Sequence, residues 1–176
     1  RSFDAHIPVE QYRRLTKNPL YIILDNVRSA FNVGSIFRLG DALRVAGLYL
    51  CGYTPCPPHV KLEKTSLGTL DYVPWRHSAT VAEAVRHVQE KNVTVWAAET
   101  TSRSVCYNAM RYPLPSAFVF GNETTGICQE TLDICDGIVE IPMCGFKNSI
   151  NIAAAVAVIG YEFLAQQKKA ADTSAA

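Results

Sequence analysis

The chain has 176 residues, 48% of them hydrophobic, which suits one folded domain with a sizeable core and argues against a largely disordered protein. Its formal net charge of +1 lacks the basic excess of many dedicated nucleic-acid-binding proteins, although a local basic patch would be hidden in such a total. No apolar run reaches the roughly 18 residues of a membrane span, and no secretory leader is visible. We therefore expect a cytoplasmic protein without a membrane partner.

The first half of the chain predicts two buried strands, each followed by a helix or loop, and one edge strand. The expected elements, in order, are a short polar helix at 7–18, a buried strand at 21–24, a helix at 33–43 and a strand at 45–50. Residues 52–60 contain three prolines and a glycine and predict a loop, and residues 64–71 fit either a short helix or a loop. Residues 72–75 predict an edge strand, because Pro74 cannot donate a ladder hydrogen bond.

The second half continues the alternation. We expect a helix at 81–91 capped by Ser78 or Thr80, strands at 93–98, 116–120 and 137–141, and a final helix at 149–167. This alternation predicts a single α/β domain whose parallel sheet is covered by helices on both faces. The expected organisation is a short N-terminal segment at 1–20, the domain at 21–167, and a polar, fraying tail at 168–176.

The six cysteines give only weak evidence for a metal-binding site. None forms a C-x-x-C pair, and the nearest spacing is that of Cys51 and Cys56, with His59 beyond. We expect free, mostly buried thiols in a reducing compartment, and no bound metal.

Three short motifs carry the chemical information. They are Asn32-Val-Gly-Ser-Ile-Phe-Arg38, Phe120-Gly-Asn-Glu-Thr-Thr-Gly126 and Ile141-Pro-Met-Cys-Gly-Phe-Lys-Asn-Ser-Ile-Asn151. The second and third each follow a predicted strand, and loops after parallel strands are where α/β proteins form ligand crevices. In the first motif, Asn32 and Gly34 are expected at a turn that brings the backbone close to a partner.

Each motif also has a simpler interpretation. Arg38 alone could be an exposed surface arginine, and the second motif could be an ordinary turn with Thr124 or Thr125 as a helix cap. Asn148 or Ser149 could simply cap the final helix. A flavodoxin-like nucleotide enzyme is disfavoured because the chain has no glycine-rich phosphate-binding loop.

Taken in order, the three motifs resemble the SpoU (TrmH-type) branch of the SPOUT RNA methyltransferases, over roughly residues 21–162. The resemblance implies an S-adenosylmethionine-dependent RNA methyltransferase that modifies a ribose 2′-hydroxyl of tRNA or rRNA. It also implies a trefoil knot in the C-terminal half and a homodimer whose active site draws on both chains. The alternative is a non-catalytic RNA- or nucleotide-binding module with the same fold.

The resemblance also implies residue roles. Asn32 and Arg38 would hold the ribose-phosphate of the substrate, with Arg38 as the catalytic residue, and Ser149 and Asn151 would lie near the transfer point. Glu123 would act either directly or by organising the loops. The expected donor pocket consists of Glu99, Thr100, Gly121, Ile141, Met143 and Ile150. Because a guanidinium stays protonated, we expect Arg38 to orient a phosphate and stabilise the developing alkoxide rather than to remove a proton.

Overall fold

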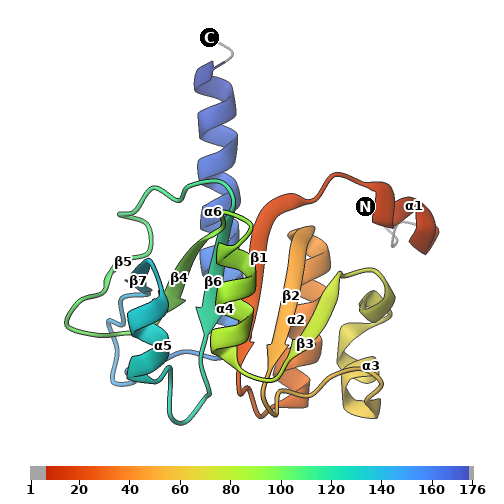
Figure 1. Cartoon of the computed structure of the whole chain (residues 1–176), viewed down its shortest axis with the longest axis horizontal. Coiled ribbons are helices and arrows are strands. Elements are labelled where there is room, and N and C mark those ends of the chain that lie inside the picture. Colours follow the sequence, from red (N-terminus) through yellow and green to blue (C-terminus); the bar gives the residue numbers. More distant parts are fainter. Residues whose placement is uncertain (1–6, 175–176) are drawn as a thin grey trace.

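A seven-stranded sheet forms the centre of the molecule in the computed structural model, which describes residues 7–174 (Figure 1). All paired strands are parallel, in the order β3-β2-β1-β6-β4-β7-β5. The strands are β1 (Asn18–Asp25), β2 (Val45–Cys51), β3 (Trp75–Ser78), β4 (Thr94–Ala98), β5 (Val105–Cys106), β6 (Ser116–Phe120) and β7 (Gly137–Glu140). The predicted parallel α/β architecture is confirmed.

Helices cover both faces of the sheet. They are α1 (Val9–Arg14), α2 (Ala30–Ala42), α3 (Val60–Ser66), α4 (Val81–Gln89), α5 (Gln129–Ile134) and α6 (Ile152–Ser174), with a 3-10 turn at Thr69–Asp71. On one face, Phe37 of α2 and Phe163 of α6 share a buried cluster with Phe118 of β6. On the other face, Val88 of α4 lies in a second cluster with Val119 of β6. Successive side chains of β6 therefore enter opposite cores, as expected for a sheet buried on both sides.

The register brings four strand ends to one level. Phe120, the last residue of β6, pairs with Leu24 of β1 on one side and Ala98 of β4 on the other, and Ala98 also pairs with Val139 of β7. Because the strands are parallel, the loops that follow β1, β4, β6 and β7 all leave from this edge, at the bottom of Figure 1. This edge is where the second and third motifs meet.

Several predicted boundaries need correction. The first helix ends at Arg14 rather than residue 18, because Asn18 already pairs with Val45 in the sheet. The edge strand is β3 at 75–78 rather than 72–75, and the short elements α5 and β5 were not predicted. Residues 60–66 form α3, where residues 52–60 were predicted as a loop and 64–71 as helix or loop.

The final helix also differs from the prediction. α6 begins at Ile152 and continues to Ser174, so most of the predicted fraying tail is helical. Figure 1 shows its C-terminal half projecting beyond the sheet. The trefoil knot and the proposed domain division stay predictions, and residues 1–6 of the N-terminal segment lie outside the described residues.

Two further properties follow from the fold. All six cysteines are free thiols, but the expectation that most of them are buried is wrong. Only Cys51 is buried; the others are half-buried (Cys56, Cys106, Cys135) or exposed (Cys128, Cys144). Within residues 7–174, every helix is too short or too polar to cross a membrane.

Candidate active site

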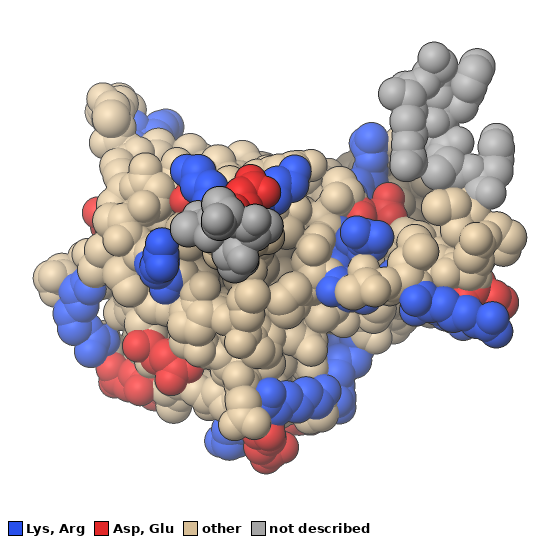
Figure 2. Space-filling model, turned by 90° about the horizontal axis from the view of Figure 1, so that it is seen from above, with Lys and Arg blue, Asp and Glu red and all other residues tan. Residues whose placement is uncertain are grey.

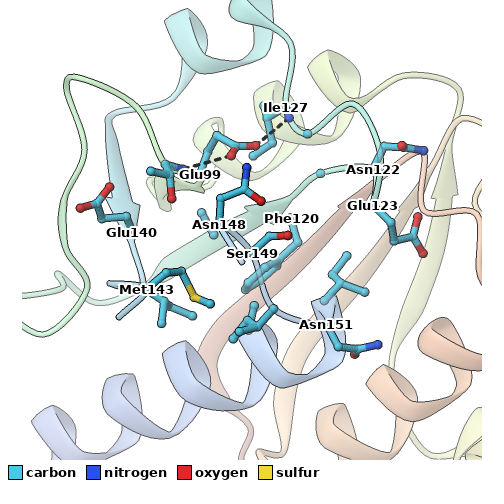
Figure 3. A pocket seen from close by; sticks show the side chains of 18 of the residues that line it. Glu99, Phe120, Asn122, Glu123, Ile127, Glu140, Met143, Asn148, Ser149 and Asn151 are labelled. Carbon is cyan, nitrogen blue, oxygen red and sulfur yellow. Dashed lines mark hydrogen bonds between the residues drawn. The ribbon is translucent and has the colours of Figure 1, made fainter. Parts of the chain in front are cut away.

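A cavity of about 980 Å³ opens where β4, β6 and β7 end and α6 begins (Figure 3). It is lined by the loops that follow these strands and by a few apolar side chains. Ten of the eleven predicted site residues line it, namely Asn32, Glu99, Thr100, Gly121, Glu123, Ile141, Met143, Ser149, Ile150 and Asn151. The fold thus brings all three motifs to one hollow.

Arg38 is the predicted site residue that the cavity does not include. It is exposed on α2, six residues after Asn32 and therefore about 9 Å further along the helix axis. Arg38 does not meet the cavity of its own chain.

Glu99 fastens two of the cavity loops to each other. Its carboxylate accepts hydrogen bonds from the backbone N–H of Thr100 and of Ile127, each at 3.0 Å (dashed in Figure 3). Gly126 makes this contact possible: its φ is +65°, and a Cβ there would lie 2.5 Å from Glu99 Oε2. Both oxygens of Glu99 are thus engaged by backbone donors of the cavity wall.

The second motif is a tight turn organised by Asn122, a residue that the sequence analysis did not single out. Its buried side chain accepts hydrogen bonds from the backbone N–H of Thr124 and Thr125, at 2.8 and 3.0 Å. A Cβ on Gly121 would lie 2.5 Å from the Gly126 carbonyl carbon, so the two ends of the turn touch. The interpretation of Thr124 or Thr125 as a helix cap is wrong, because α5 begins only at Gln129. The importance of Asn122 could have been inferred only from its position inside the second motif.

A chain of hydrogen bonds connects the three motifs. The Glu123 carboxylate accepts from the backbone N–H of Arg28 (3.0 Å) and Ser29 (3.1 Å) and from Asn32 Nδ2 (3.1 Å). Asn32 Oδ1 in turn accepts from Asn151 Nδ2 at 3.0 Å. Asn32 therefore stands between the second and third motifs and fixes their relative position.

The electrostatics of Glu123 follow from these contacts. Partial desolvation raises the pKa of its carboxyl, but the hydrogen bonds from backbone amides and from the Asn32 side chain lower it by more. The net result is a pKa below the ordinary glutamate value, so the residue is ionised at neutral pH. A negative charge at this place also complements the N-terminal end of the α2 dipole.

Asn151 also begins α6. Its side-chain oxygen accepts a hydrogen bond from the backbone N–H of Ala153 at 2.8 Å, which is the geometry of a helix N-cap. The predicted caps, Asn148 and Ser149, lie before the helix, so that prediction is wrong. Both are exposed and line the cavity, which leaves the Ser149 hydroxyl available to a ligand there.

The charged side chains of the site do not make a metal centre. Across the described residues, no group of three or more His, Cys, Asp or Glu side chains is placed to hold a metal ion. The polar groups that line the hollow are amides, hydroxyls, carboxylates and the ammonium group of Lys147.

Comparison with known proteins agrees with this geometry. A sequence model described as the SpoU rRNA Methylase family matches residues 19–161. The tRNA (guanosine(18)-2′-O)-methyltransferase of Thermus thermophilus is 32% identical over 162 residues, which cover 92% of this chain and 82% of that protein. A 23S rRNA (guanosine-2′-O-)-methyltransferase of Vibrio vulnificus is 28% identical over 150 residues, 85% of this chain and 60% of that protein.

A solved structure shows the same fold. The SpoU methyltransferase AviRb from Streptomyces viridochromogenes, in complex with the cofactor AdoMet, superposes with a TM-score of 0.80 at 26% identity. The match covers 89% of this chain and 63% of that one, so this chain spans less than two thirds of the Vibrio and Streptomyces proteins.

Proposed function

The chain belongs to the SpoU rRNA methylase family, and from that membership we propose that it transfers a methyl group from S-adenosylmethionine to a ribose 2′-hydroxyl of tRNA or rRNA. The observation that carries the proposal is the hydrogen-bonded series Glu123–Asn32–Asn151, which joins all three motifs at one cavity. The names of the Thermus and Vibrio relatives support an RNA ribose as acceptor.

The cavity fits the proposed donor in size and chemistry. Its volume of about 980 Å³ lies at the upper end of the range for small-molecule pockets. Ile141, Met143 and Ile150 offer apolar surface, while the loops around Glu99 and Gly121 offer backbone groups that could hydrogen-bond an adenosine. When bound, S-adenosylmethionine supplies an electrophilic methyl group.

The acceptor side would be held by polar residues. Transfer requires the hydroxyl to be aligned within about 3–3.5 Å of the methyl carbon and to lose its proton. Arg38 would bind the adjacent phosphate through its planar fork and stabilise the developing alkoxide. Ser149 lies in the cavity and would face the ribose, whereas Glu123 and Asn151 would act by positioning Asn32 and the third motif.

We also propose that the protein is a homodimer with composite sites. Arg38 lies outside the cavity of its own chain, on an exposed stripe of α2 that includes Phe31, which is 55% exposed. Tyr161 on the neighbouring α6 is 53% exposed, and Phe146 in the third motif is 98% exposed. A second copy could bury these exposed aromatic side chains, and in the proposed dimer its Arg38 would complete the cavity of the first chain.

RNA would approach from the end of the molecule that carries the motif loops. Figure 2 views the opposite end, where Lys and Arg are interspersed with Asp and Glu rather than gathered into one basic surface. With an RNA substrate and six free thiols, the cytoplasm is the proposed compartment.

Nucleoside mass spectrometry tests the proposed reaction. RNA from cells that lack the protein should be missing one 2′-O-methylated nucleoside, and purified protein with S-adenosylmethionine should restore it. Calorimetry should show that the protein binds the donor. Donor binding without methyl transfer to any RNA would instead support a non-catalytic module.

A further inference from the structure

Tyr53 is an exposed aromatic residue whose position is nevertheless held at two points. Its side chain is 61% exposed. Its hydroxyl accepts a hydrogen bond from Asn122 Nδ2 at 2.8 Å, and its backbone N–H donates to Asn26 Oδ1 at 3.3 Å. The hydroxyl end of the ring and the backbone of Tyr53 are therefore both held in place, while most of the side chain remains open to solvent.

The surrounding loop is built to hold this orientation. Gly52 has φ +61°, and a Cβ there would lie 2.9 Å from Asn26 Cγ, so the close contact with Asn26 requires glycine. Thr54 is buried; its hydroxyl donates to the Cys51 carbonyl at 2.7 Å and accepts from the Val27 backbone at 3.0 Å. The loop after β2 is thus docked onto the loop after β1, on both sides of Tyr53.

Tyr53 is also connected directly to the active site. Its partner Asn122 lies between Gly121 and Glu123 in the second motif, and Figure 3 shows the Asn122 side chain pointing away from the donor cavity. A second hollow of about 420 Å³ adjoins the first and shares Asn32, Glu123 and Thr124 with it. The exposed Arg28 lines this second hollow together with Asn32 and Glu123, so a basic residue adjoins the hydrogen-bonded motif residues.

We propose that Tyr53 is a substrate-positioning residue on which an unpaired base of the RNA, close to the target nucleotide, stacks while Arg28 binds a phosphate. The inference rests on the proposed function and adds the residues that hold the acceptor strand. An aromatic ring presented to solvent in a fixed orientation accepts any base by stacking, and single-stranded RNA exposes its bases for such contacts. Arginine suits the neighbouring phosphate because its donors form a fork.

Substitutions at Tyr53 separate stacking from a merely structural hydrogen bond. Tyr53→Leu removes the aromatic face, and we expect KM for RNA to rise roughly 5- to 150-fold, the equivalent of one lost base–aromatic stack. The affinity for S-adenosylmethionine should not change. Tyr53→Phe and Tyr53→Trp keep an aromatic face and should retain KM within a few-fold of wild type. The acceptor is total RNA from cells that lack the protein.

A binding measurement and a control complete the test. The fluorescence of 2-aminopurine in a decameric single-stranded RNA should be quenched when the RNA binds wild type or Tyr53→Trp, but not when it binds Tyr53→Leu. Val60→Ala, which trims another exposed apolar side chain (66% exposed), should behave as wild type.

Equal losses in Tyr53→Phe and Tyr53→Leu, or a parallel loss of donor affinity, would show a structural role and overturn the proposal. An unchanged KM in Tyr53→Leu would overturn it while leaving the methyltransferase function intact, whereas an inactive wild type would overturn both.

Discussion

At the scale of single residues, the contacts of Glu123 favour one of its two predicted roles. Its carboxylate is hydrogen-bonded to two backbone amides before α2 and to the Asn32 side chain. A carboxylate committed to three donors is poorly suited to accept a proton from the substrate. These contacts favour a positioning role for Glu123, acting through Asn32, over a direct catalytic one.

The lowered pKa of Glu123 predicts a pH-dependent contribution to stability. A carboxyl whose folded pKa is depressed stabilises the folded state above its unfolded pKa, about 4.3, and that stabilisation is lost as pH falls through the folded pKa. Glu123→Gln should therefore lower Tm at pH 7, by the equivalent of about 1 kcal/mol or less because the residue is exposed. The difference in Tm between Glu123→Gln and wild type should shrink steadily below about pH 4.

Thermal unfolding monitored by circular dichroism between about pH 3 and pH 8 measures this difference. Glu90→Gln, at an exposed glutamate that ends α4, is the control and should track wild type across the range. A Glu123→Gln difference that stays constant with pH would mean that the charge of Glu123 is not what stabilises the loop junction.

At the scale of elements, the packing of α2 on α3 explains why Gly34 is a glycine. Gly34 was expected at a turn next to a ligand, but it lies inside α2 and faces α3. A Cβ at Gly34 would overlap the Thr65 hydroxyl and lie 2.9 Å from Thr65 Cβ and 3.1 Å from the Leu62 carbonyl oxygen. The close approach that requires glycine is therefore between two helices.

Gly34→Ala should destabilise the fold despite the better helix propensity of alanine. The Thr65 hydroxyl donates to the Lys61 carbonyl at 2.9 Å and cannot move without losing that bond. Overpacking costs about 1 to 3 kcal/mol and the propensity gain returns about 1, so we expect the free energy of unfolding to fall by up to about 2 kcal/mol. Urea denaturation would measure it. Gly145→Ala is the matched control, since no atom lies within 4 Å of a Cβ there, and an equal loss in both variants would refute the helix-contact explanation.

At the scale of the whole molecule, the site assembles where the two halves of the sheet meet. Strands β1 to β3 come from the first half of the chain, and β6 joins them to β4 and β7 by pairing with β1. The first motif follows β1, while the second and third follow β6 and β7. Asn32 brings the first half of the chain to a cavity whose other lining residues lie between 98 and 159, and Arg38 is not among them.

The composite-site proposal predicts rescue between inactive variants. Arg38→Ala and Asn151→Ala should each be inactive as pure proteins. After subunit exchange in an equal mixture, half of the dimers are mixed and each holds one intact site, so about a quarter of wild-type methyl transfer should return. Sedimentation checks the dimer and a tagged-subunit pull-down checks the exchange. No rescue despite proven exchange would place Arg38 at the site of its own chain.

Sequence patterns alone predicted the parallel α/β architecture and, through the three motifs, most of the residues that were expected to share a site. Buried parallel strands are short continuous apolar runs, and the strand at 116–120 was predicted with the bounds it has because local composition alone defines it. The motif residues could be identified because glycine, asparagine and proline mark loops at strand ends.

Which of these residues contact one another could be seen only in the three-dimensional fold. The Glu123–Asn32 and Asn32–Asn151 bonds join positions 91 and 119 residues apart, and no local pattern reports such contacts. The same holds for the contact of Tyr53 with Asn122 and for the position of Arg38 outside the cavity. Side-chain partners depend on strand order and helix packing, and these are set by burial across the whole chain rather than by the neighbours of each residue.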